Sequence, residues 1–431
     1  MSATGIAILL LVGGFLILII ARVPIPLALM ASTAVTMLYL NLPLMTMVQQ
    51  MAKAINSFSL MAVPFFILAG EIMGAGGISD KMVDFANAVV GRFRGGLAYV
   101  NCLDSMFFGG ISGSAVADVS SLGSIVVPMM EKSGYDRDFS IALTVTTSCQ
   151  GILIPPSHNM IFFALAAGGV SVGKLFLGGA IPGVMLGLML MVYCRYISYK
   201  RQYPKGEALG LREILKITAD ALLALFTAVI IMGGVTLGWF TATESAAIAC
   251  IYAFIISFFV YKKLKLRDIP QILGNVIRTL CLSFSLIAAA GAFGYVLAFL
   301  KVPALVTQFL LDVTSNKVLL LLLINLMLLV LGCIMDMAPI IFIVTPILLP
   351  VVKALGMDPV HFGVMMIFNL AIGLCTPPVG SALFVGCAVG KSSIEKVTRE
   401  MLPMYAVMLI GLLLVTFVPA LSTWLPNLIM G

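Results

Sequence analysis

The chain has 431 residues, of which 61% are hydrophobic and only 10% are charged, and its mean hydropathy is +1.15. Soluble globular domains carry about 25% charged residues, so this composition excludes a soluble protein and predicts a chain that lies largely in a lipid bilayer. The net charge of +7 does not indicate nucleic-acid binding, because no segment is polar enough to form a soluble domain.

Apolar segments of about 20 residues, the length that crosses a bilayer, recur along the chain. The predicted transmembrane segments are 3–21, 24–41, 57–75, 138–169, 175–197, 217–240, 244–261, 279–300, 361–389 and 401–427. The first segment is interpreted as a retained helix rather than a signal peptide, because it lacks a basic leading region. The sequence therefore predicts an all-α polytopic membrane protein.

Four shorter apolar segments occur as two pairs, 96–110 with 115–130 and 318–332 with 337–353. At 1.5 Å per residue, a helix of this length reaches about 24 Å or less and falls short of the full bilayer. The residues that join the first pair are polar and rich in glycine. Each pair is predicted to form a re-entrant hairpin: hairpin one over 96–131 and hairpin two over 317–354.

Two of the long segments, 138–169 and 361–389, contain a proline pair, Pro155-Pro156 and Pro377-Pro378. Each proline removes an amide donor and frees a carbonyl one turn earlier. Such irregular backbone is tolerated at membrane depth only where it lines a cavity or a site. Freed carbonyls suit a cation such as Na⁺, whereas the positive end of a restarted helix suits an anion. Both segments are therefore predicted to be broken helices at a transport site.

A shift of the sequence against itself by 222 positions (332 − 110) aligns residues 110–174 with 332–396 without a gap. The matched residues concentrate on Gly and Pro, which set backbone breaks rather than fill a lipid-facing surface. In the first copy, the residues that are identical to their counterparts 222 positions later are Gly110, Ile125, Pro128, Gly134, Asp136, Gly151, Pro155, Pro156, Phe162, Ala166, Gly168, Ser171 and Lys174. Internal repeats are typical of secondary transporters, and we predict two, at 1–216 and 217–431.

Counting the membrane crossings decides how the two repeats are oriented. Five predicted segments, from 138–169 to 279–300, separate hairpin one from hairpin two. Because five is odd, the repeats are inverted, and the hairpins enter from opposite sides of the membrane.

The basic residues assign these sides to compartments. The positive-inside rule places the basic loops at 194–216 and 262–278 in the cytoplasm. The basic residues that then fall outside are Lys53, Lys174, Lys301, Lys317 and Lys353, which leaves 25 − 5 = 20 of the 25 inside. Both termini are predicted to be periplasmic.

Ionisable residues in these segments are candidates for function, because each is costly in a bilayer. Asp336, at the tip of hairpin two and opposite Ser114 in the repeat, is expected to bind a cation or substrate hydroxyls. Asp118, one turn after the first tip, either caps or braces hairpin one.

The other ionisable residues receive structural or peripheral roles. Glu71 and Asp104 are expected to be structural, and Glu244 to cap a helix. His158 is expected to line the cavity beside the first proline pair, and His361 to lie at the membrane interface.

Two other classes of membrane protein, an intramembrane protease and a channel, fit the sequence less well. Gly110-Ile111-Ser112-Gly113 with His158 is compatible with an intramembrane serine protease. That reading leaves the repeated glycine and prolines unexplained, because the second half lacks the Ser and the His. A channel is disfavoured because no filter-like run or ring of charges is visible. The chain is therefore predicted not to be an enzyme.

At these motifs the chain resembles the large membrane subunit of tripartite ATP-independent periplasmic (TRAP) transporters, in the ion transporter superfamily. The segments that carry the resemblance are Pro64–Met73, Gly110–Asp118, Ile154–Asn159, Gly332–Asp336 and Gly373–Gly380. The resemblance covers essentially the whole chain and implies an elevator-type permease of the bacterial inner membrane that uses Na⁺ to import a small organic anion. It also implies two partners, a small four-helix membrane subunit and a soluble periplasmic substrate-binding protein.

The resemblance further implies which residues bind ions and substrate. One Na⁺ site would use Ser112, Gly113 and Ser114 with the break that starts at Pro155. The other would use Gly332, Asp336, Gly373 and Thr376. The substrate would lie between them, near Ser114, Ser157, Asn159 and Asp336.

The sequence departs from the family pattern at one informative place. The dicarboxylate branch tends to carry Ser-Ile-Pro after the first proline pair, whereas this chain has Ser157-His158-Asn159. The departure favours an acidic sugar such as sialic acid over a C4-dicarboxylate. A Na⁺/anion symporter that needs no binding protein remains a further alternative.

Overall fold

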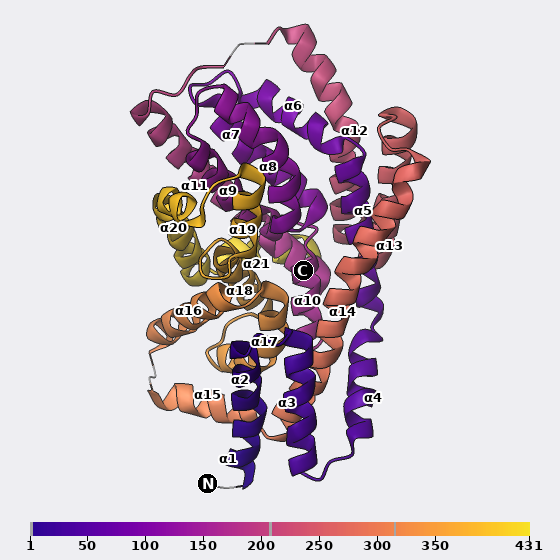
Figure 1. The fold of residues 1–431 in the computed structure, drawn as a ribbon, viewed down its shortest axis with the longest axis vertical. Coiled ribbons are helices and arrows are strands. Elements are labelled where there is room, and N and C mark those ends of the chain that lie inside the picture. Colours follow the sequence, from indigo (N-terminus) through magenta and orange to yellow (C-terminus); the bar gives the residue numbers. More distant parts are fainter. Residues whose placement is uncertain (1–2, 207–208, 314–315) are drawn as a thin grey trace.

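The computed structural model describes residues 3–206, 209–313 and 316–431, and within these ranges the chain forms helices and no β-strand (Figure 1). The α-helices are α1 (Ala3–Ile8), α2 (Gly14–Ile20), α3 (Ile25–Tyr39), α4 (Leu44–Ile55), α5 (Ala62–Ala75), α6 (Ile78–Val90), α7 (Gly96–Ser112), α8 (Ala115–Lys132), α9 (Arg137–Leu153), α10 (His158–Ala166), α11 (Val172–Lys200), α12 (Leu211–Thr236), α13 (Ala242–Ile255), α14 (Ile269–Phe299), α15 (Val302–Val313), α16 (Lys317–Ile334), α17 (Met337–Ala354), α18 (Pro359–Leu374), α19 (Ser381–Gly390), α20 (Ile394–Phe417) and α21 (Ala420–Met430).

Among the described residues, nine helical segments are long and apolar enough to cross a membrane. The pair α9 and α10, bent by 50° at the first proline pair, forms a tenth. The prediction of an all-α membrane protein with a helix broken at Pro155-Pro156 is therefore confirmed.

Several elements differ from the prediction. Helices α4, α6 and α15 lie where no element was expected, because none of them has an apolar run long enough to register as a span. The segment 401–427 is not one helix: α20 ends at Phe417 and α21 starts after Pro419, whose ring cannot continue the hydrogen-bond ladder. The hairpin arms contain 17 or 18 residues, slightly more than the apolar runs suggested.

The helix boundaries repeat with the same offset of 222 positions as the sequence. Helix α7 ends at Ser112 and α16 at Ile334, and the next helices begin at Ala115 and Met337. The same offset separates the starts of α9 and α18, at Arg137 and Pro359, and the starts of α11 and α20. The backbone breaks of both halves therefore lie at equivalent positions.

Equivalent helices of the two halves also pack against each other. The thiol of Cys149 on α9 lies 3.1 Å from the carbonyl oxygen of Ala371 on α18, the residue 222 positions further along. Around this contact, α8 packs on α19 and α17 packs on α10. Crosswise contacts between equivalent elements are those of a two-fold arrangement. The limits of the two repeats, 1–216 and 217–431, stay a prediction.

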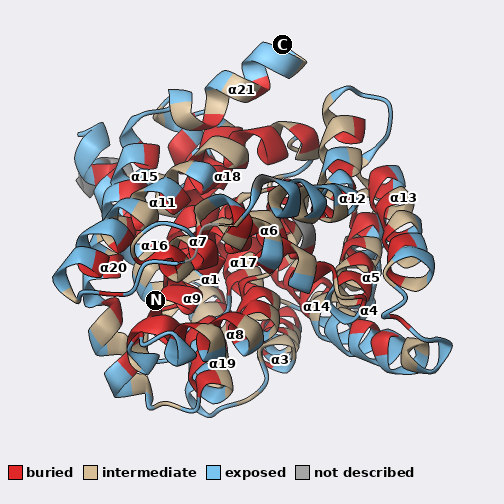
Figure 2. Ribbon diagram, turned by 90° about the horizontal axis from the view of Figure 1, so that it is seen from above, coloured by how far each residue is buried: buried red, intermediate tan, exposed pale blue. Residues whose placement is uncertain are grey.

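Helices α9 and α18, which precede the two proline pairs, belong to the buried interior of the molecule (Figure 2). Every residue from Phe139 to Leu153 of α9 and from Val360 to Leu374 of α18 is buried. Helices α2, α12 and α13 instead expose large apolar side chains, including Ile20, Val229 and Ile251. Exposed apolar surface of this kind fits lipid contact, so the molecule has a protein-covered centre and a lipid-compatible periphery.

Buried amides tie each hairpin to its broken helix. Asn101 on α7 donates a hydrogen bond of 2.7 Å to Thr144 on α9, and Thr147 donates one of 3.0 Å to the amide oxygen of Asn101. In the second half, Asn369 on α18 donates bonds of 2.9 Å to the backbone carbonyl and the side-chain oxygen of Asn325 on α16. A buried amide is costly unless it is paired, so these bonds orient the hairpin arms against α9 and α18.

Candidate functional site

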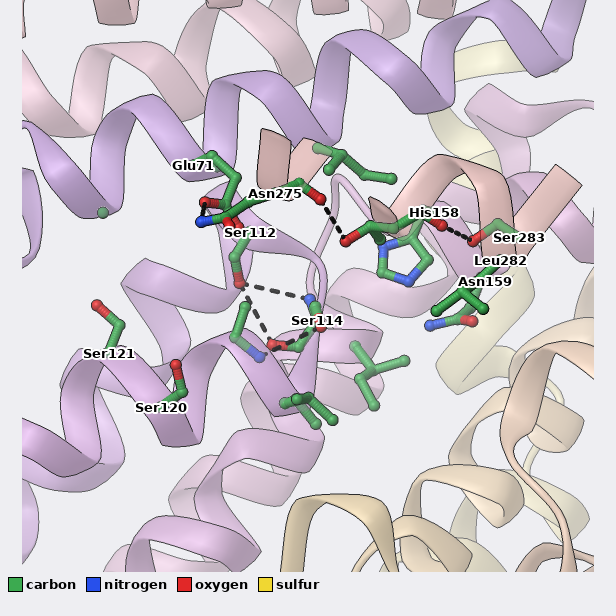
Figure 3. A pocket seen from close by; sticks show the side chains of 18 of the residues that line it. Glu71, Ser112, Ser114, Ser120, Ser121, His158, Asn159, Asn275, Leu282 and Ser283 are labelled. Atoms are coloured by element: carbon green, nitrogen blue, oxygen red, sulfur yellow. Dashed lines mark hydrogen bonds between the residues drawn. The ribbon is translucent and has the colours of Figure 1, made fainter. Parts of the chain in front are cut away.

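A cavity of about 850 Å³ lies where the two hairpin tips, the first break and helices α5 and α14 meet (Figure 3). One wall consists of residues of hairpin one, α10 and hairpin two. Its polar side chains are those of Ser112, Ser114, Ser120, Ser121, His158, Asn159 and Asp336. The opposite wall consists of α5 and the start of α14. Its polar side chains are those of Glu71, Asp268, Gln271, Asn275, Thr279 and Ser283.

The tip of hairpin one rests on the first proline pair. Gly113 has a left-handed backbone (φ 60°), and a Cβ atom at this position would lie only 2.5 Å from the carbonyl oxygen of Pro156. The next residue, Ser114, caps α8 by accepting a hydrogen bond from the backbone N–H of Ala117. Ser112 and Ser114 contact each other at 3.4 to 3.5 Å across the tip. Glycine is therefore required at the tip for the two breaks to touch.

The tip of hairpin two rests on the second proline pair. The backbone N–H of Val379 donates a 3.1 Å hydrogen bond to the carbonyl of Cys333. Gly332 and Gly373 approach so closely that a Cβ atom on Gly373 would lie 2.6 Å from the Gly332 backbone. From α20, the hydroxyl of Tyr405 donates a 2.6 Å bond to the carbonyl of Cys375. The irregular backbone of the second half is thus held by partners from two other helices.

The structure places the predicted site residues in two groups. The residues that line the cavity are Ser112, Ser114, Asn159 and Asp336. Those outside the cavity lining are Gly113, Pro155, Ser157, Gly332, Gly373 and Thr376. The second group lies at the contacts between tips and breaks, where backbone oxygens gather. In that group the hydroxyl of Ser157 is buried and has no hydrogen-bond partner among the described residues.

The wall formed by α5 and α14 carries polar residues that the sequence analysis missed. The carboxylate of Glu71 accepts a 3.1 Å hydrogen bond from the side-chain amide of Asn275. Figure 3 shows this pair beside Ser112, facing the tip of hairpin one. A Cβ atom on Gly70 would lie 3.6 Å from the Cα atom of Ser112, so the tip contacts α5 directly. The structural role expected for Glu71 is therefore incomplete, because its carboxylate also borders the cavity.

The other ionisable residues give mixed outcomes. Glu244 forms a capping box with Thr241, as predicted, and His158 lines the cavity, also as predicted. His361, in the first turn of α18, is buried in the protein, and its ring nitrogen lies 2.7 Å from the carbonyl oxygen of Val415. Its location at the membrane interface stays a prediction. Asp118 does not cap α8, because Ser114 occupies that position.

Asp104 and Asp118 form an unusual feature of hairpin one. Both carboxyl groups are fully buried, and none of their oxygens has a hydrogen-bond partner among the described residues. Ser105, the neighbour of Asp104, donates its own hydrogen bond to Thr147 instead. Burial without partners is costly for a charged group, so neither site favours an ionised carboxylate. The structural role expected for Asp104 stays a prediction.

Comparison with known proteins identifies the family. The family model described as "Tripartite ATP-independent periplasmic transporter, DctM component" matches residues 12–421, which is nearly the whole chain. The chain belongs to this family. It is thus a large permease subunit of a TRAP transporter, as the motifs suggested, and its fold can be read as that of a transporter.

Similar proteins carry different substrate names. The chain is 41% identical to the uncharacterized protein YgiK of Salmonella typhimurium, over 98% of this chain and 97% of that protein. It is 39% identical to the sialic acid TRAP transporter large permease protein SiaM of Vibrio cholerae, over 89% and 90%. It is 40% identical to the C4-dicarboxylate TRAP transporter large permease protein DctM of Pseudomonas aeruginosa, over 86% of each chain. Near-equal identity to both leaves the substrate open.

The fold is similar to that of a solved transporter of low sequence identity. The YdaH transporter of Alcanivorax borkumensis superposes with a TM-score of 0.65 over 88% of both chains, at 14% sequence identity. At this identity the likeness concerns the fold alone. It agrees with the helical transporter architecture described above.

Substitution at the first tip tests the contact between the tip and the break. We expect Gly113→Ala to lower substrate uptake in proteoliposomes by about tenfold or more, because its methyl group would push the tip away from Pro156 by a sizeable part of 1 Å. Gly134→Ala is the matched control, because Gly134 is also left-handed (φ 87°) but has no atom within 4 Å of an added Cβ. Equal uptake by the two variants would contradict the importance of this contact.

Proposed function

We propose that this TRAP permease subunit is a Na⁺-coupled importer of a small organic anion, and that the favoured substrate is an acidic sugar such as sialic acid. The observation that carries the proposal is the charge of the cavity. Its charged lining residues among those described are the carboxylates of Glu71, Asp268 and Asp336, and the lining contains no Lys or Arg. Arg267 lies 3.8 Å from Asp268 outside the lining, so Glu71 and Asp336 carry most of this negative charge. An organic anion is repelled by such a wall unless cations bind with it. This requirement supports the proposal of Na⁺ coupling.

Two sites near the cavity suit Na⁺, which prefers oxygen ligands. At the first, Ser112 and Ser114 flank Gly113, and a Cβ atom on Gly113 would lie 2.5 Å from the carbonyl oxygen of Pro156 and 3.1 Å from the Cα atom of Ser157. At the second, Asp336 starts α17 beside the contact of Gly332 with Gly373, and Thr376 lies in the break itself. Among the described residues no cluster of three His, Cys, Asp or Glu side chains is present, so carbonyl and hydroxyl oxygens would supply most ligands.

The polar lining favours a sugar acid over a C4-dicarboxylate. Amides and hydroxyls of Asn159, Asn275 and Ser283 can bond to substrate hydroxyls, and the carboxylate of Glu71 accepts hydrogen bonds from them. The single carboxylate of the substrate would lie at the start of α8 or α10, whose free N–H groups attract an anion. A C4-dicarboxylate brings a second negative charge and no further donors, so it fits this lining less well. It remains the alternative substrate class.

The position of the cavity supports an elevator mechanism and an inward-facing state. The cavity lies between the hairpins and broken helices on one side and α5 and α14 on the other, which is where one group of helices would slide against another. It extends to Ala75 at the end of α5 and to Asp268 before α14. Both positions lie on the side of the membrane that the basic residues assign to the cytoplasm. We therefore propose an inner-membrane protein with both termini in the periplasm.

Removal of the carboxylate at the second tip tests the Na⁺ site. We expect Asp336→Ala to abolish Na⁺-driven uptake in reconstituted liposomes, because the carboxylate is the only charged side chain at this tip. Asp312→Ala, on the exposed surface of α15, is the control and should transport normally. Unchanged uptake by Asp336→Ala would remove Asp336 from the site.

The need for partner proteins tests whether this subunit works in a three-component transporter. Liposomes that contain this subunit and the small membrane subunit should take up substrate only when the cognate periplasmic binding protein is added. Family membership supports this expectation. Robust uptake of free substrate by the membrane subunits alone would favour the ordinary Na⁺/anion symporter.

Chemical labelling tests the orientation of the cavity. In a Cys281→Ser background, which removes an exposed thiol, Gln271→Cys should react with a membrane-impermeant thiol reagent added from the cytoplasmic side. Asn316→Cys, which directly precedes hairpin two, should react from the periplasmic side that the basic residues assign to it. The opposite pattern in inside-out and right-side-out vesicles would reverse the proposed topology.

A further inference from the structure

Basic and aromatic side chains gather where α11 ends and α7 begins. The guanidinium groups of Arg94 and Arg195 lie 5.6 and 5.7 Å from the centre of the same ring, that of Tyr199. The backbone of Arg94 pairs with that of Lys205 in the loop after α11, which adds a third cation. Two cations that meet on one ring repel each other, so this arrangement calls for an anion between them.

No carboxylate supplies that anion among the described residues. Arg94 donates hydrogen bonds only to neutral oxygens, the carbonyl of Tyr203 at 3.2 Å and the side chain of Gln202. Arg195 has neither an ion pair nor a hydrogen bond within the described part of the chain. Arg201, a few residues further on, shows the contrast: it binds Asp136 at 2.8 Å and Glu400 at 2.7 Å. The two arginines on Tyr199 therefore keep unused, fork-shaped donors that match a phosphate group.

The face of α11 that leads to this cluster is compatible with a lipid chain. Exposed side chains follow one row along the helix at intervals of four residues, Val184, Leu188, Val192 and Tyr196, and the next position is Lys200. The ammonium group of Lys200 lies 5.8 Å from the ring of Tyr196. From Val184 to Lys200 the row covers 16 × 1.5 Å, about 24 Å, which is close to one leaflet with its headgroups. Apolar, aromatic and basic side chains thus follow the order of acyl chain, interface and phosphate.

We propose that Arg94, Arg195 and Lys200, with the rings of Tyr196 and Tyr199, form a binding site for the phosphate headgroup of an anionic phospholipid. The acyl chains lie along the exposed row of α11, and the phosphate oxygens accept hydrogen bonds from the two guanidinium groups. Arg94 directly precedes Gly95, whose N–H donates a 2.9 Å bond to the carbonyl of Pro204. The lipid therefore also braces the loop that covers the start of hairpin one.

Lipid retention by the purified complex with the small subunit tests the site. The complex is exchanged into detergent with phosphatidylglycerol or phosphatidylcholine, and bound lipid is counted by native mass spectrometry. Wild type should retain phosphatidylglycerol preferentially. Each basic residue near a headgroup contributes about fivefold, so R94Q/R195Q should retain about 25-fold less phosphatidylglycerol. The control R212Q/K216Q removes two cations from the start of α12 on the same side and should retain as much as wild type.

Three outcomes would overturn the proposal. If R94Q/R195Q and R212Q/K216Q lose equal amounts of bound phosphatidylglycerol, only the general positive charge on the cytoplasmic side of the protein attracts the lipid. Displacement of phosphatidylglycerol by millimolar inorganic phosphate would mean that the site binds a free anion. Loss of the small subunit from R94Q/R195Q would mean that this face is a protein interface. The single variant R195Q controls for misfolding, because the Arg195 side chain makes no hydrogen bond within the described chain. It should retain about fivefold less phosphatidylglycerol than wild type.

Discussion

Backbone polar groups have no water to bond with inside a bilayer, and the rest of this structure depends on that constraint. The chain leaves helical geometry at two hairpin tips and two proline pairs. In the second half the irregular backbone finds partners on other segments: Val379 donates to Cys333 at the hairpin tip, and Tyr405 of α20 donates to Cys375. Because the breaks must meet to be satisfied, they create a polar region deep in an otherwise apolar protein. The cavity is a consequence of the same requirement.

The close approach of the tips to the broken helices explains why glycine marks the repeat. Gly332 faces Gly373 in the second half, and Gly109 faces Gly151 in the first. The sequence offset aligns Gly110, not Gly109, with Gly332. The structure therefore uses the neighbouring glycine of the first half, while Gly110 faces the carbonyl of Pro155 instead. Both halves therefore contain a glycine–glycine contact between the hairpin and its broken helix, but the hairpin glycine is shifted by one residue in the first half. A comparison of residue types alone cannot detect this shift.

Features with a local sequence signal were predictable, and those built by long-range contacts were not. The helix breaks at the two tips and at the first proline pair followed from Gly and Pro placement, which acts on the backbone within a few residues. The re-entrant course of the hairpins stays a prediction, and both arms of hairpin two are long and apolar enough to span a membrane. The pair of Glu71 and Asn275 joins residues 204 positions apart, and no repeat relates them. A signal for this wall did exist. Asp268, Gln271, Asn275, Thr279 and Ser283 recur at intervals of three or four residues and form one polar face, but the predicted span began only at 279.

The unequal placement of charge links the proposed function to the proposed lipid site. Arg94 and Arg195 lie near helix ends, where they can reach phosphate, and no Lys or Arg is among the described residues that line the cavity. An arginine in the cavity would bind an organic anion tightly without Na⁺ and would hold it there. A lining of carboxylates, amides and hydroxyls instead makes the affinity for the anion conditional on bound cations. Under the proposed coupling, Na⁺ therefore binds before the anion or together with it, and its departure into the low-sodium cytoplasm releases the substrate.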